Sequence, residues 1–190
     1  RGGWPERRWS RPRAPGYNRP TMHVEIVHWP NPILTRGTSP VTPADLTDDF
    51  RDTVAQMTRL MVDLRGVGLA APQAGIAKRF MLICATGEAG DEQVLLNPEI
   101  VAREGDEEME EGCLSFPKIY GTVRRAAKAK VRWRDLDWKE HEETLDGFVA
   151  RIFQHELDHL NGVVFIDRMD EADLAAAKPR LTELKKAFAA

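Results

Sequence analysis

The sequence predicts an α+β fold in which antiparallel or mixed sheets pack around a central helix, with one further helix near each end of the chain. Helical patterns occupy three separate segments. Runs typical of strands cluster between the first two of these segments instead of alternating with helices, which favours α+β over alternating α/β. The 190 residues and the 42% hydrophobic content favour one domain with a sizeable core.

The first helix is expected to begin near Thr42 and Pro43, since threonine is a good N-cap and proline suits the first helical position. Gly66 is expected to end it. One apolar stripe, typical of a helix that packs on the core, is formed between them by Leu46, Phe50, Val54, Met57, Met61 and Leu64. The last helix is expected over residues 171–190, where Pro179 is placed to kink or split it.

The strands are expected in runs rich in β-branched and other apolar residues. A hairpin turn is expected at residues 135–139, and a short strand after the central helix at residues 163–166. The main runs span residues 80–84, 94–96, 128–136 and 141–145.

Composition narrows the classes of partner. The 27 Lys and Arg residues nearly balance the 30 Asp and Glu residues, so the net charge of −3 gives no general attraction to DNA. No apolar run approaches the ~18–20 residues of a membrane span, so no membrane is expected. Two cysteines are too few for a disulfide framework, which indicates a reducing compartment. Of the two, Cys84 ends an apolar run and is expected to be a buried core thiol.

Residues 1–21 differ from the rest of the chain. They contain six arginines, four prolines and a single acid, Glu6, without helical or strand periodicity. We expect a disordered or extended basic arm, followed by one domain over residues 22–190. An organellar transit segment and an RNA-binding arm remain alternatives for this stretch.

The central helix is expected within residues 147–162, which contain His-Glu-x-x-His. Positions four apart lie roughly 40° apart on a helix, so His155 and His159 can direct ring nitrogens at one metal ion such as zinc. Glu156 lies about 100° from His155, where a carboxylate would serve as a base for a water on that metal. Both histidines border a broad apolar arc, which indicates a largely buried helix. A polar arc opposite is formed by Arg151, Gln154, Asp158 and Asn161.

Two shorter blocks accompany this helix. In residues 66–73, the two glycines that flank Val67 permit close approach of another backbone, and the block lacks the pattern of a phosphate-binding loop. In residues 111–115, Gly112 leaves room beside Cys113, whose thiol reads more naturally as a metal ligand than as half of a disulfide. The alternatives are a small core residue at Cys113 and a solvated acidic loop at residues 107–111.

The blocks GVGLAAPQ, EGCLS and QHELDH, in this order and with this spacing, closely resemble the peptide deformylases. The resemblance extends from about Met22 through Asp167 and looks like the bacterial and organellar type. It implies that Cys113, His155 and His159 bind one divalent metal, and that residues 22–190 are a single catalytic domain. Members of this family remove the N-formyl group from the initiator methionine of new polypeptides and release formate.

The resemblance also implies roles around the metal. Glu156 would act as general base and then as proton donor to the departing amine. The side-chain amide of Gln73 and the backbone N–H of Leu114 would stabilise the oxyanion. Substrate would be held as an added strand by backbone at Val67, Gly68 and Gly112, with Phe148 in an apolar pocket for the methionine side chain. Arg151 has no assigned role.

The remaining expectations concern cofactor, partners and location. Fe(II) is expected in the cell, with Zn(II), Ni(II) or Co(II) as alternatives that suit two imidazoles and a thiolate. The partners would be N-formylmethionyl nascent peptides and, as an alternative to a solvated helix face, the ribosome, which would meet Lys178, Arg180, Lys185 and Lys186. The location would be a bacterial cytoplasm, or an organelle if residues 1–21 are a transit remnant.

Two other readings of the histidine pair stay open. A zinc peptidase would take its third ligand downstream, from Asp170 or Glu171. A closed structural zinc site would add a fourth protein ligand, such as His141. For Asp158, an ion pair with Arg124 or Arg125 is expected.

Overall fold

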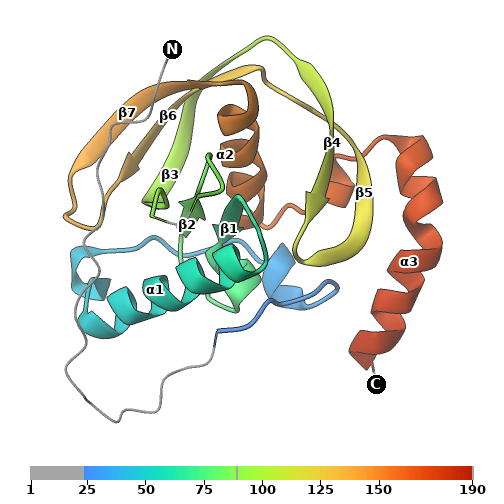
Figure 1. The fold of residues 1–190 in the computed structure, drawn as a ribbon, viewed down its shortest axis with the longest axis horizontal. Helices are drawn as coiled ribbons and strands as arrows, with labels where there is room; N and C mark the ends of the chain where they lie inside the picture. Colours follow the sequence, from blue (N-terminus) through green and yellow to red (C-terminus); the bar gives the residue numbers. More distant parts are fainter. Residues whose placement is uncertain (1–23, 89, 190) are drawn as a thin grey trace.

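The computed structural model describes residues 24–88 and 90–189 (Figure 1). The basic arm predicted at residues 1–21 lies outside the described residues. Within them, no helix combines the length and the apolar character needed to cross a membrane.

The larger sheet is antiparallel throughout, in the order β1-β2-β3-β6-β7. Its strands are β1 (Gly68–Ala70), β2 (Phe80–Ile83), β3 (Gln93–Glu104), β6 (Lys128–Arg134) and β7 (Glu140–Asp146). Figure 1 shows this sheet curving around one helix, with β1 at its edge.

Three α-helices form in the described chain: α1 (Asp48–Asp63), α2 (Gly147–Leu160) and α3 (Glu171–Ala189). Helix α2 lies inside the curve of the sheet, α1 lies across its other side, and α3 lies beside the two-stranded ribbon (Figure 1). The α+β fold with a central helix and a helix toward each end is therefore confirmed.

The periodicity of β2 explains this layering. Successive side chains of a strand point to opposite faces. Met81 and Ile83 pack in the cluster that contains α2, whereas Phe80 and Leu82 pack in the cluster that contains α1. All four are buried because each face of the sheet is covered by a helix.

The ribbon of β4 (Glu107–Cys113) and β5 (Phe116–Arg125) is antiparallel and corrects the alternative of a solvated loop at residues 107–111. Strand β5 alternates regularly between buried and less buried positions, and α3 covers its buried face. Strand β4 alone reads as solvated because four of its seven residues are acidic. It forms a strand because β5 pairs with it.

The predicted start of the first helix is wrong. Helix α1 begins at Asp48, where the hydroxyl of Thr47 accepts a hydrogen bond from the Phe50 N–H at 3.2 Å. Thr42 opens a separate 3-10 turn, Pro43–Asp45, because the Asp45 carboxylate accepts its backbone N–H at 2.7 Å.

The short strand expected at residues 163–166 is also wrong. Phe165–Asp167 forms a 3-10 turn in which the Asp167 carboxylate accepts the Val164 N–H at 3.2 Å. Helix α3 runs on through Pro179 without being split.

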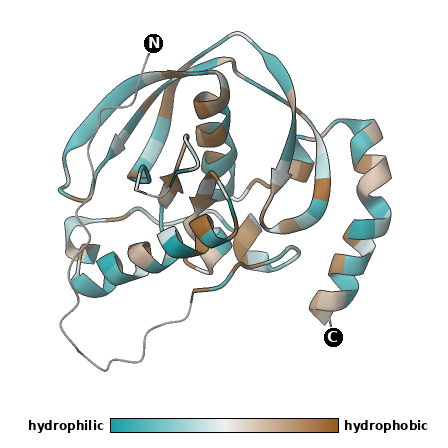
Figure 2. Ribbon diagram, in the orientation of Figure 1, coloured by the Kyte–Doolittle hydropathy of each residue, from teal (hydrophilic) through white to brown (hydrophobic). Residues whose placement is uncertain are grey.

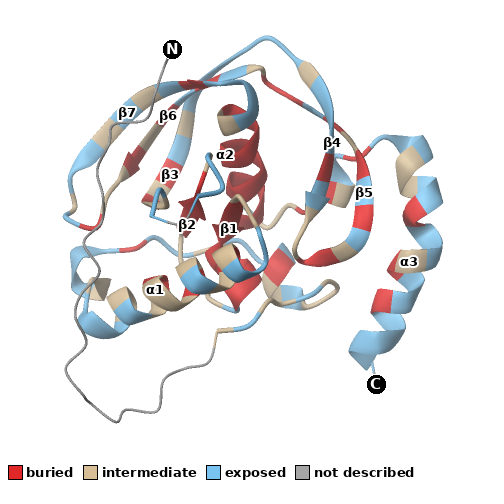
Figure 3. Cartoon of the chain, viewed as in Figure 1, coloured by how far each residue is buried: buried red, intermediate tan, exposed pale blue. Residues whose placement is uncertain are grey.

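Hydropathy and burial agree on which helix is central. Figure 2 shows α2 as largely hydrophobic and α3 as mixed. Figure 3 shows α2 buried along nearly its whole length, as predicted. Three members of its polar arc, Arg151, Gln154 and Asp158, are buried as well, whereas Asn161 just after the helix is exposed. These buried polar side chains require partners inside the protein.

Candidate metal centre

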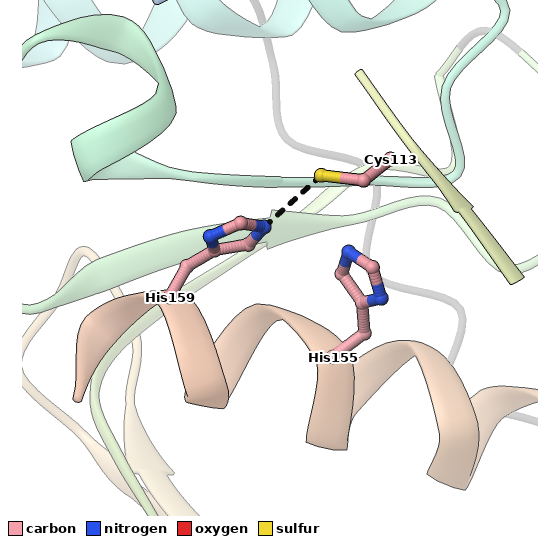
Figure 4. A group of neighbouring side chains, drawn as sticks. All are labelled: Cys113, His155 and His159. Carbon is pink, nitrogen blue, oxygen red and sulfur yellow. Dashed lines mark hydrogen bonds between the residues drawn. The ribbon is translucent and has the colours of Figure 1, made fainter. Parts of the chain in front are cut away.

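Three side chains meet at the inner face of α2. Cys113 ends β4, while His155 and His159 lie one turn apart on α2. Their potential ligand atoms all lie within 4.8 Å of one another, and Cys113 Sγ is 3.3 Å from His159 Nε2. Figure 4 shows the thiol and both rings directed toward one another. A zinc ion with bonds of ~2.0–2.3 Å to such atoms fits among them after small side-chain adjustments.

Glu111 fixes the orientation of His155. His155 Nδ1 lies 2.9 Å from Glu111 Oε2, so the ring donates from Nδ1 and turns the Nε2 lone pair toward the cluster. Burial alone raises the pKa of Glu111, but hydrogen bonds from His155 and Arg125 outweigh burial and lower it to about 2. The carboxylate is therefore charged and accepts the proton that selects this tautomer.

The surroundings of His155 and His159 favour a positive charge between them. Burial alone lowers the pKa of His155, yet its hydrogen bonds to Cys113 and Glu111 outweigh burial and raise that pKa to about 10. The surroundings therefore favour positive charge at this point. Burial holds the pKa of His159 well below its ordinary value, and its ring is neutral, as metal ligation requires.

Gln73 is held in one orientation. It lies in the 3-10 turn Ala71–Ala74 directly after β1 and is almost fully buried. The backbone N–H of Ala70 donates to Gln73 Oε1 at 2.8 Å, so the amide nitrogen faces the cluster and lies 3.4 Å from Cys113 Sγ. A fixed N–H donor beside a metal site can stabilise an oxyanion without rearranging.

Glu156 is buried directly against β1. A Cβ atom at Gly68 would lie 2.5 Å from Glu156 Oε1, so any other residue there would have to displace this carboxylate from its observed position. Its Oε2 has no hydrogen-bond partner among the described residues. Burial raises the pKa of Glu156 to about 7, which is close to the value that suits a general base at neutral pH.

A cavity of about 740 Å³ adjoins the cluster, within the range typical of ligand pockets. The structure brings most of the predicted site residues to its walls, while His159 is buried behind them. Leu114 lies in the turn between β4 and β5, and Phe148 in the first turn of α2 is about half exposed, at 49%. The predicted residues in the walls are Val67, Gly68, Gln73, Gly112, Cys113, Leu114, Phe148, His155 and Glu156.

Sequence reasoning predicted one pair of the buried ion network behind His155, Asp158 with Arg125, and missed the contacts of Glu111. Arg125 contacts both oxygens of Glu111, at 2.6 and 2.9 Å, and donates to Asp158 at 2.8 Å. Arg151 donates to Glu111 at 2.7 Å. The expected pair of Asp158 is confirmed with Arg125 and wrong for Arg124, which bonds the exposed Glu108 instead. The polar arc on α2 was the available signal, because buried charges need partners.

The contacts of residues 27–29 with the site were also not predicted. The backbone N–H of Val27 donates to the carbonyl of Gln73 at 2.8 Å, and that of Trp29 donates to the carbonyl of Ser115 at 3.0 Å. This segment therefore ties the turn that carries Gln73 to the loop that follows Cys113.

The alternative ligands lie elsewhere. His141 contacts Asp135 at 2.7 Å and stacks on Trp133. Asp170 accepts the Ala172 N–H at 2.8 Å at the start of α3. Neither belongs to the cluster, nor does Glu171, which argues against the downstream ligand and the His141 site. A helix-borne His-Glu-x-x-His, a thiol from a strand and an adjoining cavity together define the class of metal-dependent hydrolases.

Comparisons with known proteins give the family. A family model described as Polypeptide deformylase matches residues 23–175. The peptide deformylase of Acidobacterium capsulatum is 42% identical over 164 residues, which are 85% of this chain and 95% of that protein. That of Rhodopirellula baltica is 39% identical over 166 residues, 86% of this chain and 82% of that protein.

Solved structures agree. A plant peptide deformylase superposes with a TM-score of 0.83 at 35% identity, covering 92% of this chain and 94% of that one. The peptide deformylase from Plasmodium falciparum superposes with a TM-score of 0.82 at 38% identity, covering 86% of this chain and 96% of that one. The chain belongs to the polypeptide deformylase family, as its three sequence blocks indicated, and it is an enzyme.

Proposed function

We propose that Cys113, His155 and His159 bind the divalent metal ion with which this deformylase removes the N-formyl group from formylmethionine at the start of nascent polypeptides and releases formate. The observation that carries the proposal is the convergence of one sulfur and two imidazoles within 4.8 Å, beside a cavity large enough for a peptide end. Residues 22–190 would form the single catalytic domain.

The ion, when bound, supplies Lewis acidity: it polarises the formyl carbonyl and lowers the pKa of a coordinated water toward neutrality. A thiolate and two neutral imidazoles leave such a site with a net charge of about +1, since only the thiolate carries charge. A thiolate also donates more charge than a third imidazole, so the reaction depends more strongly on a protein base.

Glu156 is that base in our proposal. Its carboxylate removes a proton from the attacking water and later delivers it to the amine that leaves. The unpaired Oε2 and a pKa raised by burial to about 7 support this assignment. A matched pKa lets one group accept and return a proton within a single turnover.

Gln73 and Leu114 would stabilise the negative charge that develops on the formyl oxygen when the formyl carbon is attacked. The contact between Gln73 Oε1 and the Ala70 N–H supports this role, because it turns the amide nitrogen toward the cluster, where one N–H donates to Cys113 Sγ at 3.4 Å and the other can face the reacting carbonyl. The Leu114 backbone N–H would supply the second donor, from a residue that borders both Cys113 and the cavity. One such donor typically contributes about 100–1000-fold in rate.

The peptide would bind as an added strand. Strand β1 lies at the edge of its sheet, so backbone near Val67 and Gly68 can pair with an extended chain, while Gly112 would contact it from β4. Main-chain pairing tolerates different side chains, as an enzyme that meets many nascent chains requires. Phe148 would contact the methionine side chain from the cavity wall.

We further propose Fe(II) as the ion in the cell, with Zn(II), Ni(II) or Co(II) able to occupy the same ligands. The ribosome is a proposed partner through Lys178, Arg180, Lys185 and Lys186 on α3. Their ammonium and guanidinium groups would meet RNA phosphates. The proposed location is a bacterial cytoplasm, or an organelle if residues 1–21 serve as a transit segment.

Formate release from formyl-Met-Ala tests the function. The protein should be loaded separately with Fe(II), under anaerobic conditions, and with Ni(II), Co(II) and Zn(II), with chelated protein as the control. We expect release with at least one metal and none after chelation. No release with any of the four would contradict the function.

A further inference from the structure

The ring of His155 is held by more than its hydrogen bond to Glu111. That bond constrains Nδ1 alone, so the ring could still tilt about the line from Nδ1 to the carboxylate. Two aromatic neighbours limit this tilt. The Phe165 ring lies 6.1 Å from the His155 ring between centroids, at an interplanar angle of 34°, and the His159 ring lies 5.2 Å away, at 66°. Both distances are typical of rings in contact. Since His159 is itself a proposed ligand, Phe165 is the neighbour that can fix the ring plane without binding metal.

Phe165 also reaches toward the sulfur ligand. It lies in the 3-10 turn that follows α2 and is 1% exposed. Its ring meets the ring of Phe116 edge to face, with centroids 5.2 Å apart. Phe116 is the first residue of β5 and pairs with Cys113 across the ribbon. Phe165 therefore contacts one proposed ligand directly and is separated from another by one residue, although the two ligands come from different elements.

A third ring holds Phe116 from behind. Trp29 stacks on Phe116, with centroids 5.7 Å apart and an interplanar angle of 27°. The Trp29 backbone N–H also donates to the carbonyl of Ser115 at 3.0 Å, beside the same ring. The rings of Trp29, Phe116 and Phe165 thus form an aromatic column that ends on His155. A close-packed interior transmits the displacement of one side chain to its neighbours, so a change at Phe165 should be felt at the ligands.

We propose that Phe165 is a positioning residue for the metal centre, whose ring fixes the plane of the His155 imidazole and, through Phe116, its distance from Cys113. The inference rests on the proposed function, in which His155 and Cys113 bind the metal. Phe165 is not among the described residues that line the cavity, so it acts on the metal ligands and not on substrate. Glu111 selects the tautomer of His155, and Phe165 adds the orientation of the ring plane.

Phe165→Leu tests this role through metal binding. Leucine keeps the position apolar but removes the ring that contacts His155 and leaves a gap beside it. We expect the Kd for Co(II) to rise about tenfold, at the lower end of the loss of about 10–100-fold that is typical when support for a ligand is removed. The visible absorption bands of bound Co(II), which depend on ligand geometry, should shift. At saturating metal, kcat should fall while KM stays unchanged, because substrate meets the same cavity wall.

Phe80→Leu is the matched control. Phe80 is also fully buried and also meets another ring edge to face, that of Phe50, with centroids 5.0 Å apart. It packs in the cluster that contains α1 and does not belong to the candidate metal cluster. Both substitutions should lower the midpoint of urea unfolding, but only Phe165→Leu should change the Kd and the Co(II) spectrum at a temperature where both variants are folded. Equal changes in the two variants, or none in Phe165→Leu, would overturn the inference.

The unmodified protein also decides the question, whether or not Phe165→Leu folds. In the Zn(II) form, nuclear Overhauser effects should join the ring protons of Phe165 and His155. Their absence would mean that the imidazole adopts another plane when it binds metal, and the inference would be overturned while the deformylase function stayed intact. Failure of the unmodified protein to bind Co(II) or Zn(II) would instead contradict the metal site of the proposed function.

Discussion

Helices α2 and α3 show two ways for a helix to carry charge. Every residue of α2 from Ala150 to Leu160 is buried, including two acids and one arginine, whereas only Ala177, Leu181 and Leu184 are buried among the described side chains of α3 (Figure 3). On α2 each buried charge lies in a defined place because burial demands a partner or a function. On α3 no charged residue among the described side chains is buried, and the contacts of its charged groups lie at or near the surface. Substitutions on α2 should therefore cost far more than matched substitutions on α3.

The largest contrast is expected between two glutamates. Glu156→Gln should lower kcat by about 10²–10⁴-fold, because it removes the proposed base and keeps its shape. Metal content should stay unchanged, since Glu156 is not a proposed ligand. Glu183→Gln on α3 should leave kcat unchanged, since Glu183 pairs with Arg180 at the surface. Assays of formate release at fixed times give kcat for both variants. Full activity in Glu156→Gln would contradict the role of Glu156 as the base.

The same contrast should appear in stability. Asp158→Asn leaves Arg125 buried without its second carboxylate, and breaking such a pair lowers the free energy of unfolding by about 3–5 kcal/mol. Glu183→Gln breaks an exposed pair and should cost at most about 1 kcal/mol. Urea unfolding at a fixed metal concentration gives both values. Equal losses would show that burial does not separate the two helices.

Metal binding depends on the one proposed ligand that does not come from α2. Cys113→Ser should weaken metal affinity at least tenfold, since even residues that only support a ligand contribute 10–100-fold. At a metal concentration about 100 times the Kd of the unmodified protein, bound metal adds about 2.7 kcal/mol to the free energy of unfolding. At the same concentration this contribution should be smaller in Cys113→Ser, because the variant binds metal more weakly. Cys84→Ser is the control, because Cys84 is buried outside the cluster. Elemental analysis after dialysis should show metal lost in the first variant and kept in the second; loss in both would contradict the assignment.

The smallest effect is expected between two neighbouring lysines of α3. Lys185 Nζ lies 5.2 Å above the ring of Trp29, whereas no such contact is described for Lys186. Lys185→Ala should cost about 0.5–1 kcal/mol and Lys186→Ala should stay within about 0.5 kcal/mol of zero. Thermal unfolding of both variants measures the difference. A larger loss at Lys186 would mean that α3 depends on its charges more than its exposure indicates.

Local rules were enough to predict the helical part of the candidate site. The spacing of His155 and His159 and the intervening Glu156 follow from helix geometry alone, and the structure places all three on α2. The run at residues 80–84 was predicted as a strand because it is apolar throughout, whereas the runs at 128–136 and 141–145 contain charged residues that strands disfavour and were also confirmed as strands. Bringing Cys113 to the histidines required the resemblance to a family, because the thiol lies 42 residues before His155 in the chain.

What local rules missed depends on contacts between distant segments. Glu111 ends an acidic run that is typical of a solvated loop, and it is buried only because Arg125 and Arg151 arrive from another strand and from α2. The predicted helix start at Thr42 was wrong for a local reason. Thr42 and Thr47 are both good N-caps, and the sequence does not indicate which of them begins the longer helix.

The contact between Gly68 and Glu156 makes position 68 informative beyond this chain. Any side chain there would meet the carboxylate at 2.5 Å, so a homologue with another amino acid at this position must hold its acid elsewhere or have lost it. The amino acid at this position in an alignment would then show which relatives can hold the carboxylate where this chain holds it.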